Sequence, residues 1–385
     1  MAQIFLIIGA GMAGLPIAHY VLKHYADQYD LKVIIVSKST EFYWNIASPR
    51  AVITGQLADD KTFHSIPAAF AQYPPRRFEF IHGTVETWDP DQNSVLVKQN
   101  SGSERKIEYR TIVVATGSTY AQGMPWKLVG SSEDTRTALA HLRDKIEKAS
   151  SIVVGGGGPT GVEVAGELAY EYARAGRKKV LLVMSDALPL PPRVMDATRQ
   201  AARRELEKLG VNIIANAKVA EVDSGAGNAR RLAINKSDGS QTTLEADLFL
   251  PTWGVEYNTA FAPSSMLEED GRLKVTEQLR APGYQNAFLV GDAASLDSYA
   301  ASVREAQVRF LVAAIGNHLA AETIPQYKQD GRTVMTVTVG RDRGVGQIKS
   351  WNAWSFFIWF FKGRHMCTNI AGDYAAGKTL ILGKI

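Results

Sequence analysis

Short apolar runs rich in β-branched residues alternate along this chain with longer amphipathic stretches. Buried parallel strands are predicted by the runs at 3–8, 31–36, 111–115, 151–154, 180–184, 247–250 and 287–290. A first helix is predicted after the strand at 3–8 and ends near residue 26. Four more are predicted at 136–149, 160–175, 197–209 and 303–321. Strands that alternate with helices in this way indicate an α/β fold built on parallel sheets.

Two glycine-rich turns each follow a predicted strand and precede a predicted helix. The glycines are Gly9, Gly11 and Gly14 in the first turn and Gly156, Gly158 and Gly161 in the second. In a dinucleotide-binding turn the first glycine makes the tight turn, the second lets the backbone approach a pyrophosphate, and the third allows close helix–strand packing. One such motif is weak support for a site, but two predict two dinucleotides, as when a nicotinamide passes a hydride to a flavin.

Neither turn is accompanied by the carboxylate that commonly binds a ribose at the end of the second strand. Ser37 follows the strand at 31–36, and Ser185 follows the strand at 180–184. Ser37 can still form a hydrogen bond with a ribose. Because an acid at the second site would repel the 2′-phosphate of NADP, its absence leaves both NADH and NADPH open.

Polar residues follow two further apolar strands, at the sheet edge where ligands bind in α/β folds. Thr116 and Gly117 follow the strand at 111–115, and Gly291 and Asp292 follow the strand at 287–290. The Asp292 carboxylate can accept hydrogen bonds from the ribitol of a flavin, or it can cap the next helix. Together with the N-terminal glycines, the pattern favours the flavin role.

The composition narrows the chemistry further. The chain has 385 residues, 45% of them hydrophobic, which predicts a globular protein of two or three domains. The net charge of +4 is too small to predict nucleic-acid binding. Cys367 is the one cysteine, so the chain has no pair of thiols that could relay electrons. Electrons on a flavin must therefore pass directly to a bound acceptor. The scattered histidines predict no metal site.

An aromatic run at 351–361 precedes Lys362, Arg364 and His365. Its 11 residues are too few to cross a bilayer, which takes about 20. Tryptophans beside cations suit the headgroup zone of a membrane, so residues 351–365 are a candidate for peripheral membrane contact. They suit equally the wall of a tunnel for a lipophilic acceptor, or packing on the flavin domain or a second subunit. The oligomeric state stays open. We expect a cytoplasmic protein, because a strand at the N-terminus leaves no room for a signal peptide.

The order of GAGMAG at 9–14, Ala115-Thr116-Gly117, GGGGPTGVE at 155–163 and LVGDAA at 289–294 resembles the two-dinucleotide flavoprotein reductases. Within them the chain is similar to the apoptosis-inducing-factor-like branch, and above all to the ferroptosis-suppressor type of NAD(P)H:quinone reductase, which is related to type II NADH dehydrogenases. The stretches at 42–51, 61–63 and 344–347 support this resemblance, which covers nearly the whole chain.

The resemblance implies roles for individual residues. FAD would be bound by Gly9, Gly11, Gly14, Arg50, Val85 and Asp292. Glu163 would face the contact between flavin and nicotinamide, and Lys362 would lie near the flavin, so both are candidate catalytic residues. Two plainer interpretations stay open. Glu163 lies one turn into a helix, where acids favour the dipole whatever their function, and Arg50 could be a surface charge.

We therefore expect two Rossmann-like domains and a small C-terminal α+β segment. The FAD domain would comprise 1–118 and 250–320, with the NAD(P)H domain at 119–249 inserted in it and the C-terminal segment at 321–385. The expected function is transfer of a hydride from NAD(P)H to FAD and then of two electrons to a lipophilic acceptor, first of all a quinone. One alternative is a flavin-dependent tailoring oxidoreductase acting on a small metabolite. Another is a non-enzymatic nucleotide sensor or nucleic-acid-binding protein, which the small charge disfavours.

Overall fold

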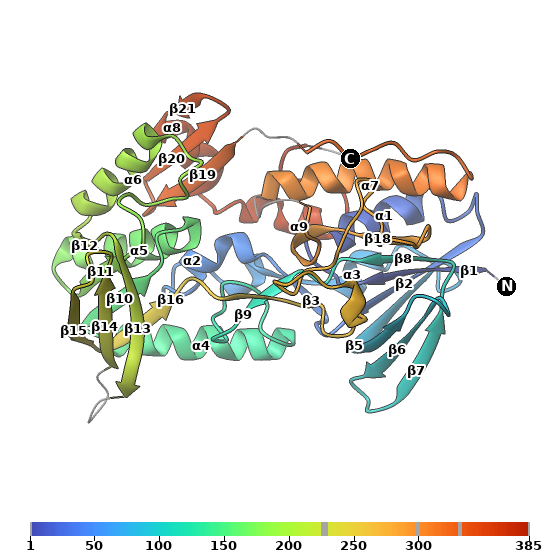
Figure 1. Ribbon diagram of the computed structural model, residues 1–385, viewed down its shortest axis with the longest axis horizontal. Coiled ribbons are helices and arrows are strands. Elements are labelled where there is room, and N and C mark those ends of the chain that lie inside the picture. Colours follow the sequence, from blue (N-terminus) through green and yellow to red (C-terminus); the bar gives the residue numbers. More distant parts are fainter. Residues whose placement is uncertain (1, 225–229, 297–300, 330–332, 384–385) are drawn as a thin grey trace.

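Two α/β lobes lie end to end in the computed structural model, which describes residues 2–224, 230–296, 301–329 and 333–383 (Figure 1). The first lobe contains the N-terminal sheet, and the second contains the sheet formed within residues 151–251. Helix α4 (Ser132–Lys148) lies along the lower side in this view, where the lobes meet. Among the described residues no helix combines the length and hydrophobicity needed to span a bilayer.

The first lobe is built on a seven-stranded sheet in the order β18-β8-β1-β2-β5-β6-β7. Its strands are β1 (Gln3–Ile8), β2 (Leu31–Ser37), β5 (Phe78–Asp89), β6 (Ser94–Gln99), β7 (Glu104–Glu108), β8 (Thr111–Val114) and β18 (Ala287–Leu289). The strands from β18 to β5 are parallel, and β6 and β7 continue from β5 as an antiparallel meander. Phe5, Leu6 and Ile7 of the central β1 are wholly buried, which explains its continuous apolar sequence.

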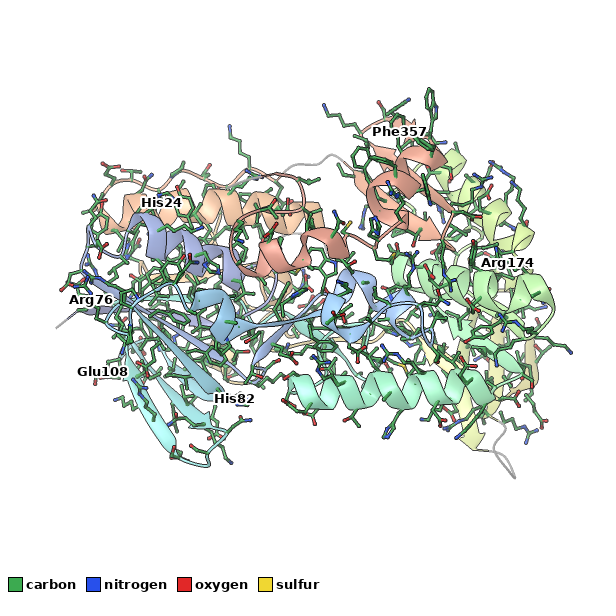
Figure 2. All side chains as sticks on the ribbon, turned by 180° about the vertical axis from the view of Figure 1, so that it is seen from behind. His24, Arg76, His82, Glu108, Arg174 and Phe357 are labelled. Carbon is green, nitrogen blue, oxygen red and sulfur yellow. The ribbon has the colours of Figure 1, made fainter. Side chains whose placement is uncertain are left out.

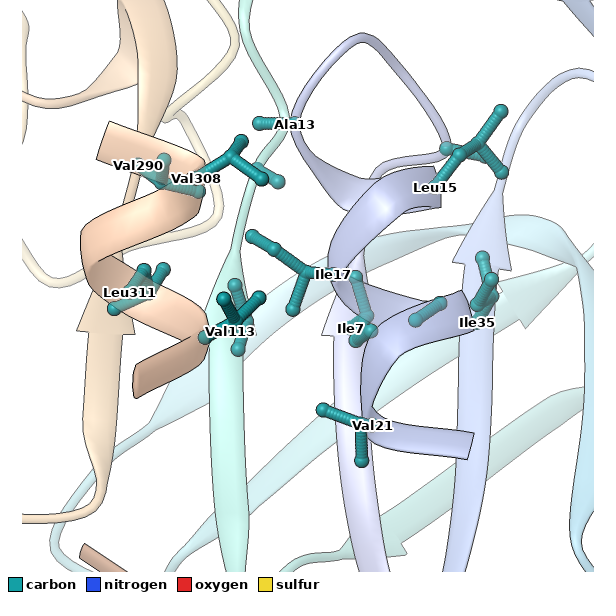
Figure 3. Packing of buried hydrophobic residues seen from close by; sticks show 14 of the residues in the cluster. Ile7, Ala13, Leu15, Ile17, Val21, Ile35, Val113, Val290, Val308 and Leu311 are labelled. Carbon is teal, nitrogen blue, oxygen red and sulfur yellow. The ribbon is translucent and has the colours of Figure 1, made fainter. Parts of the chain in front are cut away.

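Two helices, α1 (Gly14–His24) and α7 (Ala301–Leu319), cover one face of this sheet. Figure 3 shows Ile17 of α1 and Leu311 of α7 over Ile7 and Val113 of the strands, and all four belong to one buried cluster. Each fully buried side chain of this size contributes about 1.5–3 kcal/mol to folding. This packing fixes the carboxyl ends of the strands, where the glycine turn begins.

The second lobe contains a four-stranded parallel sheet in the order β12-β11-β10-β16. Its strands are β10 (Ser151–Gly155), β11 (Lys179–Val183), β12 (Val211–Ile214) and β16 (Leu248–Pro251). One face packs on α4, α5 (Pro159–Glu171) and α6 (Asp196–Lys208). The other face packs on the antiparallel strands β13 (Ala217–Ser224), β14 (Arg230–Lys236) and β15 (Gln241–Ala246).

Short elements connect the lobes. Strands β9 (Ser118–Tyr120) and β17 (Val255–Tyr257) pair with each other, and β3 (Glu41–Tyr43) pairs with β4 (Phe63–Ser65). Helix α3 (Ile66–Phe70) follows β4, while α2 (Ser48–Ala51) contacts α5 of the second lobe. The first lobe therefore presents α2 directly to the helix that follows the second glycine turn.

The C-terminal residues divide their packing between the two lobes. They form the antiparallel strands β19 (Val334–Val339), β20 (Arg343–Ile348) and β21 (Trp351–Ala353), then α8 (Ser355–Ile358), a π-helical turn at Trp359–Gly363, and α9 (Ala371–Ala375). Val337 and Val345 join the core of the second lobe, whereas Tyr374 and Leu380 join that of the first. The segment thus fastens both lobes instead of enclosing a core of its own.

The predicted α/β fold with two Rossmann-like domains is confirmed. The second sheet enters the chain between β8 and β18 of the first sheet, as an inserted domain must. The predicted residue boundaries of the domains stay a prediction. One helix was predicted too long: α5 ends at Glu171, and a 3₁₀ turn at Ala173–Ala175 leads into Gly176, whose φ of +69° ends the helical path.

Candidate active site at the two glycine turns

The first glycine turn has the backbone geometry that a dinucleotide site requires. Gly9 has a φ of +102°, and a Cβ on it would lie 2.4 Å from the carbonyl oxygen of Ala115. A Cβ on Gly14 would lie 1.9 Å from the carbonyl oxygen of Gly9, whereas one on Gly11 would meet nothing within 4 Å. Gly9 and Gly14 are therefore required by the chain itself, and Gly11 leaves open space that a pyrophosphate can approach.

A cavity of about 390 Å³ opens beside this turn, at the carboxyl ends of β1, β2, β8 and β18. Eight of the predicted cofactor-binding residues line it: Gly9, Gly11, Ser37, Val85, Thr116, Gly117, Gly291 and Asp292. Four strands and their following loops, from residues 8 to 292, thus converge on one site. This is the edge of an α/β sheet where ligands bind.

The polar groups of the cavity fit the ribose and phosphates of FAD. The Thr116 hydroxyl is buried and has no hydrogen-bond partner among the residues that the structure describes, which points to a ligand acceptor or donor. Lys38 also lines the cavity, and burial lowers the pKa of its ammonium while Asp134 opposes the shift. The Ser37 hydroxyl accepts a hydrogen bond from the Ser39 amide at 3.2 Å and stands where many such sites have an acid.

Asp292 is held by two side chains in the same cavity. Its Oδ2 accepts hydrogen bonds from Ser118 Oγ at 2.8 Å and from Lys127 Nζ at 2.5 Å, and its side chain is 4% exposed. Lys127 also lines the cavity, so its ammonium lies within reach of an anionic ligand there. Sequence reasoning missed Lys127, because it lies in a loop between β9 and α4 with no motif around it.

The second glycine turn repeats the geometry of the first. Gly156 has a φ of +104°, and a Cβ on Gly161 would lie 1.8 Å from the Gly156 carbonyl oxygen. A Cβ on Gly158 would meet nothing within 4 Å. Thr252 closes the turn from the neighbouring strand, because its Oγ1 donates to the Gly155 carbonyl oxygen at 2.7 Å. The three glycines therefore have the same three structural roles in both lobes.

The two predicted catalytic residues, Glu163 and Lys362, form an ion pair. Lys362 Nζ lies 2.6 Å from Glu163 Oε1 and donates a second hydrogen bond to the Thr336 carbonyl oxygen at 3.0 Å. Glu163 Oε1 also accepts from the Thr338 amide at 3.0 Å. Glu163 is buried near the start of α5, where the helix dipole stabilises a negative charge. Its contacts with Lys362 and Thr338 show that the C-terminal segment also balances this charge.

Arg50 lies between the lobes and is buried. Its Nη2 and Nε donate to Glu167 Oε1 at 2.7 and 3.0 Å, and its Nη1 donates to the Gly363 carbonyl oxygen at 2.8 Å. It is therefore no surface charge, and its contact with FAD stays a prediction. Sequence reasoning missed Glu167, although Glu163 and Glu167 are two acids one turn apart in a helix that is otherwise mostly apolar.

The aromatic run exposes most of its rings. Trp354, Phe356 and Phe361 are 67%, 62% and 71% exposed, and Phe357 lies on the outer rim of the C-terminal segment (Figure 2). The Arg364 guanidinium lies 5.6 Å from the Trp359 ring centre. Beside this run, burial raises the pKa of the Cys367 thiol, so the sulfur stays protonated at neutral pH.

Comparison with known proteins matches a family over most of the chain. The model of the family described as pyridine nucleotide-disulphide oxidoreductase matches residues 4–310. Oxidoreductase phnG of Penicillium herquei is 35% identical over 392 aligned residues, which cover 94% of this chain and 93% of the relative. Ferroptosis suppressor protein 1 of Homo sapiens is 26% identical and covers 94% of this chain and 92% of its own.

Solved structures show the same fold at low sequence identity. The sulfide:quinone oxidoreductase of Aquifex aeolicus superposes with a TM-score of 0.78 at 17% identity and covers 98% of this chain and 92% of its own. NDH2 of Plasmodium falciparum in complex with NADH superposes with a TM-score of 0.77 at 14% identity and covers 97% of both chains. The arrangement of the two lobes and the C-terminal segment is thus one that known proteins share.

Proposed function

We propose a function from the premise that this chain belongs to the pyridine nucleotide-disulphide oxidoreductase family, whose model spans residues 4–310. It is a flavin-dependent oxidoreductase with FAD as cofactor and NAD(P)H as co-substrate. Bound FAD supplies the redox chemistry, since it accepts a hydride from the nicotinamide and passes on two electrons. With a single cysteine the chain has no dithiol to receive them, so we propose an external lipophilic acceptor, first of all a quinone.

The observation that carries this proposal is the continuity between the Glu163–Lys362 pair and the exposed aromatic run. Lys362 directly follows Phe361, and its ammonium reaches back to Glu163 on the helix of the second glycine turn. An apolar molecule that rests on the exposed Phe361 ring would therefore lie one residue away from the lysine that pairs with Glu163. The sulfide:quinone oxidoreductase that shares this fold uses a quinone by its name, which is consistent with such an acceptor.

Lys362 and Glu163 have complementary roles in this proposal. The Lys362 ammonium is held by Glu163 and by the Thr336 carbonyl. In this proposal its positive charge would stabilise the negative charge of the reduced flavin. Glu163 balances the Lys362 charge, since its Oε1 accepts hydrogen bonds from Lys362 Nζ and from the Thr338 amide. Glu167 lies one helical turn further along α5, and Arg50 of α2 links it to the C-terminal segment by donating to both Glu167 and the Gly363 carbonyl oxygen.

The test compares the oxidation of NADH and NADPH by a short-chain quinone under anaerobic conditions with their oxidation in air-saturated buffer without quinone. We expect the quinone to accelerate turnover at least tenfold over oxygen alone. The Lys362→Met variant with FAD still bound should lose most of that acceleration. Equal rates with quinone and with oxygen would contradict the quinone proposal while leaving FAD and NAD(P)H binding untouched.

We propose further that residues 351–365 rest on the surface of an anionic membrane. Exposed tryptophan and phenylalanine rings with cations beside them suit the interface between headgroups and acyl chains. The experiment is co-sedimentation with phosphatidylcholine vesicles that contain or lack phosphatidylglycerol. Binding should need the anionic lipid and be lost in a Trp354→Ser, Phe361→Ser variant, whereas Val222→Ser, at an exposed position of β13, should bind like the wild type. Wild-type protein that stays in the supernatant would exclude the membrane role.

A second candidate is an oxidoreductase that acts on a small metabolite. It is favoured by the 35% identity to oxidoreductase phnG, which exceeds the 26% identity to ferroptosis suppressor protein 1. A screen of small oxidants and reducible metabolites with NAD(P)H separates the two candidates. Turnover with one of them and none with quinones would support this alternative.

A further inference from the structure

The two lobes repeat one backbone arrangement, and strand register aligns them residue by residue. Ile8 at the end of β1 pairs with the last residue of β8, and Gly155 at the end of β10 pairs with the last residue of β16. The next residues make equivalent hydrogen bonds: the Ala115 amide donates to the Ile8 carbonyl at 2.8 Å, and the Thr252 amide donates to the Gly155 carbonyl at 2.9 Å. Ile8 therefore corresponds to Gly155, and Ala115 to Thr252.

This alignment places Trp253 in the second lobe where the first lobe has Thr116. Each is followed by a glycine with positive φ, +65° at Gly117 and +81° at Gly254, so the backbone turns alike after both. Thr116 lines the cavity assigned to FAD. Trp253 accordingly stands at the corresponding edge of the second dinucleotide site.

The side chains at these two pairs of corresponding positions have opposite sizes in the two lobes. A Cβ on Gly155 would lie 2.1 Å from Trp253 Cζ3 and 3.0 Å from Phe249 Cε2, so the indole fills the space of the missing side chain. The first lobe has the reverse combination, with a large residue at Ile8 and a small one at Thr116. The Phe249 and Trp253 ring centres are 5.7 Å apart, yet Trp253 remains 37% exposed. The indole is thus supported by Gly155 and Phe249 on one side and accessible on the other.

We propose that Trp253 contacts the nicotinamide half of bound NAD(P)H and offers it an aromatic wall. In a doubly wound sheet the pyrophosphate lies at the glycine turn and the adenosine lies toward the next strand, here β11. Strand β16 is the neighbour of β10 on the opposite side, so the loop that carries Trp253 meets the other half of the coenzyme. A planar indole can stack on a planar ring or pack against a ribose. This inference rests on coenzyme binding at the second glycine turn and is independent of the acceptor.

The experiment measures binding of NAD⁺ and NADP⁺ to the FAD-loaded protein by calorimetry and tryptophan fluorescence. Trp253→Thr, which installs the first lobe's residue, should raise the Kd about five- to tenfold, in line with the loss of one aromatic contact. Trp253→Phe should stay within about twofold, because it keeps an aromatic ring. Nucleotide should quench the fluorescence of the wild type and of Val222→Ser, and the quenching should fall sharply in both Trp253 variants.

Bound FAD and the melting temperature show whether each variant is folded. A Trp253→Thr protein that retains both and binds nucleotide with unchanged or tighter Kd would overturn the inference. So would quenching that persists in both variants. Because the titration contains no acceptor, a failure of the quinone proposal leaves its outcome unaffected.

Discussion

Lys362 Nζ and Glu163 Oε1 lie 2.6 Å apart, although 199 positions separate the two residues in the chain. Their side chains are 16% and 7% exposed, so the pair is largely removed from water. It joins the helix of the second glycine turn to the last segment of the chain. A buried ion pair is costly to break, since one partner is then left as an uncompensated charge.

Glu163→Gln should impair both stability and turnover. It leaves the Lys362 ammonium without its carboxylate, and we expect a loss of about 3–5 kcal/mol in the free energy of unfolding. NAD(P)H oxidation should fall at least tenfold at unchanged FAD content, because the proposed role of the Lys362 charge depends on its ion pair with Glu163. Urea unfolding and steady-state kinetics measure the two effects.

The double variant Glu163→Gln, Lys362→Met supplies the control. Removing both charges should recover much of the stability lost by Glu163→Gln alone, while activity stays low. Additive losses of stability would show that the two side chains do not interact in solution.

Gly11→Ala and Gly14→Ala should have opposite signatures. Alanine at Gly14 places a Cβ 1.9 Å from a carbonyl oxygen, so it should destabilise the protein with or without FAD. Alanine at Gly11 meets open space within the protein and should lower only the affinity for FAD. Melting temperatures of apo- and holoprotein distinguish them, and an apoprotein destabilised by Gly11→Ala would contradict the assignment.

Lys127→Met should weaken FAD binding about 10- to 150-fold, which corresponds to the roughly 1.5–3 kcal/mol of one hydrogen bond to a charged group. Lys127 lines the cofactor cavity and donates to Asp292, so the variant removes a cation from the cavity and takes one hydrogen-bond donor away from Asp292. Recovery of flavin fluorescence on dilution measures the dissociation. Lys378→Met, which removes an exposed lysine paired with Asp373, should bind FAD like the wild type.

Stability should fall as the pH drops from about 6.5 to about 4, in part through His19. The His19 ring is buried, with Nε2 2.9 Å from the Ala375 carbonyl oxygen and Nδ1 3.0 Å from the Tyr73 hydroxyl. A carbonyl only accepts, so Nε2 carries the hydrogen of a neutral ring. Burial lowers the pKa of His19 to about 4. The unfolded chain therefore takes up a proton in this range before the native protein does.

The expected cost of this uptake is about 1.4 kcal/mol per pH unit and about 3 kcal/mol in total. Urea unfolding of the wild type and of His19→Gln between pH 7 and pH 4 measures it. Between pH 7 and pH 4 the free energy of unfolding of His19→Gln should fall by about 3 kcal/mol less than that of the wild type. Burial also lowers the pKa of His318 to about 4. Its contribution to the pH dependence of stability is present in both the wild type and the variant. Parallel pH profiles would contradict the role of His19.

Local constraints made much of this structure predictable. The glycine turns follow from steric limits within a few residues, and the strands follow from continuous burial on both sheet faces. The expectation that Glu163 and Lys362 each lie near the flavin came from a family resemblance, and the ion pair between them was not predicted by any local pattern. The partner of Arg50 is 117 positions away, and that of Lys127 is 165 positions away, so only tertiary packing decides them. The aromatic run was ambiguous because exposed and buried roles favour the same residues.

The two sheets can be completed at different stages of synthesis on the ribosome. All strands of the second sheet lie within residues 151–251, so that sheet can be completed while later residues are still being added. The first sheet must wait for β18, and its core also needs Tyr374 and Leu380 near the end of the chain. The sheet that begins first is therefore the last to be completed, and a truncated translation product would carry a complete second sheet, its core still lacking Val337 and Val345, beside an incomplete first sheet.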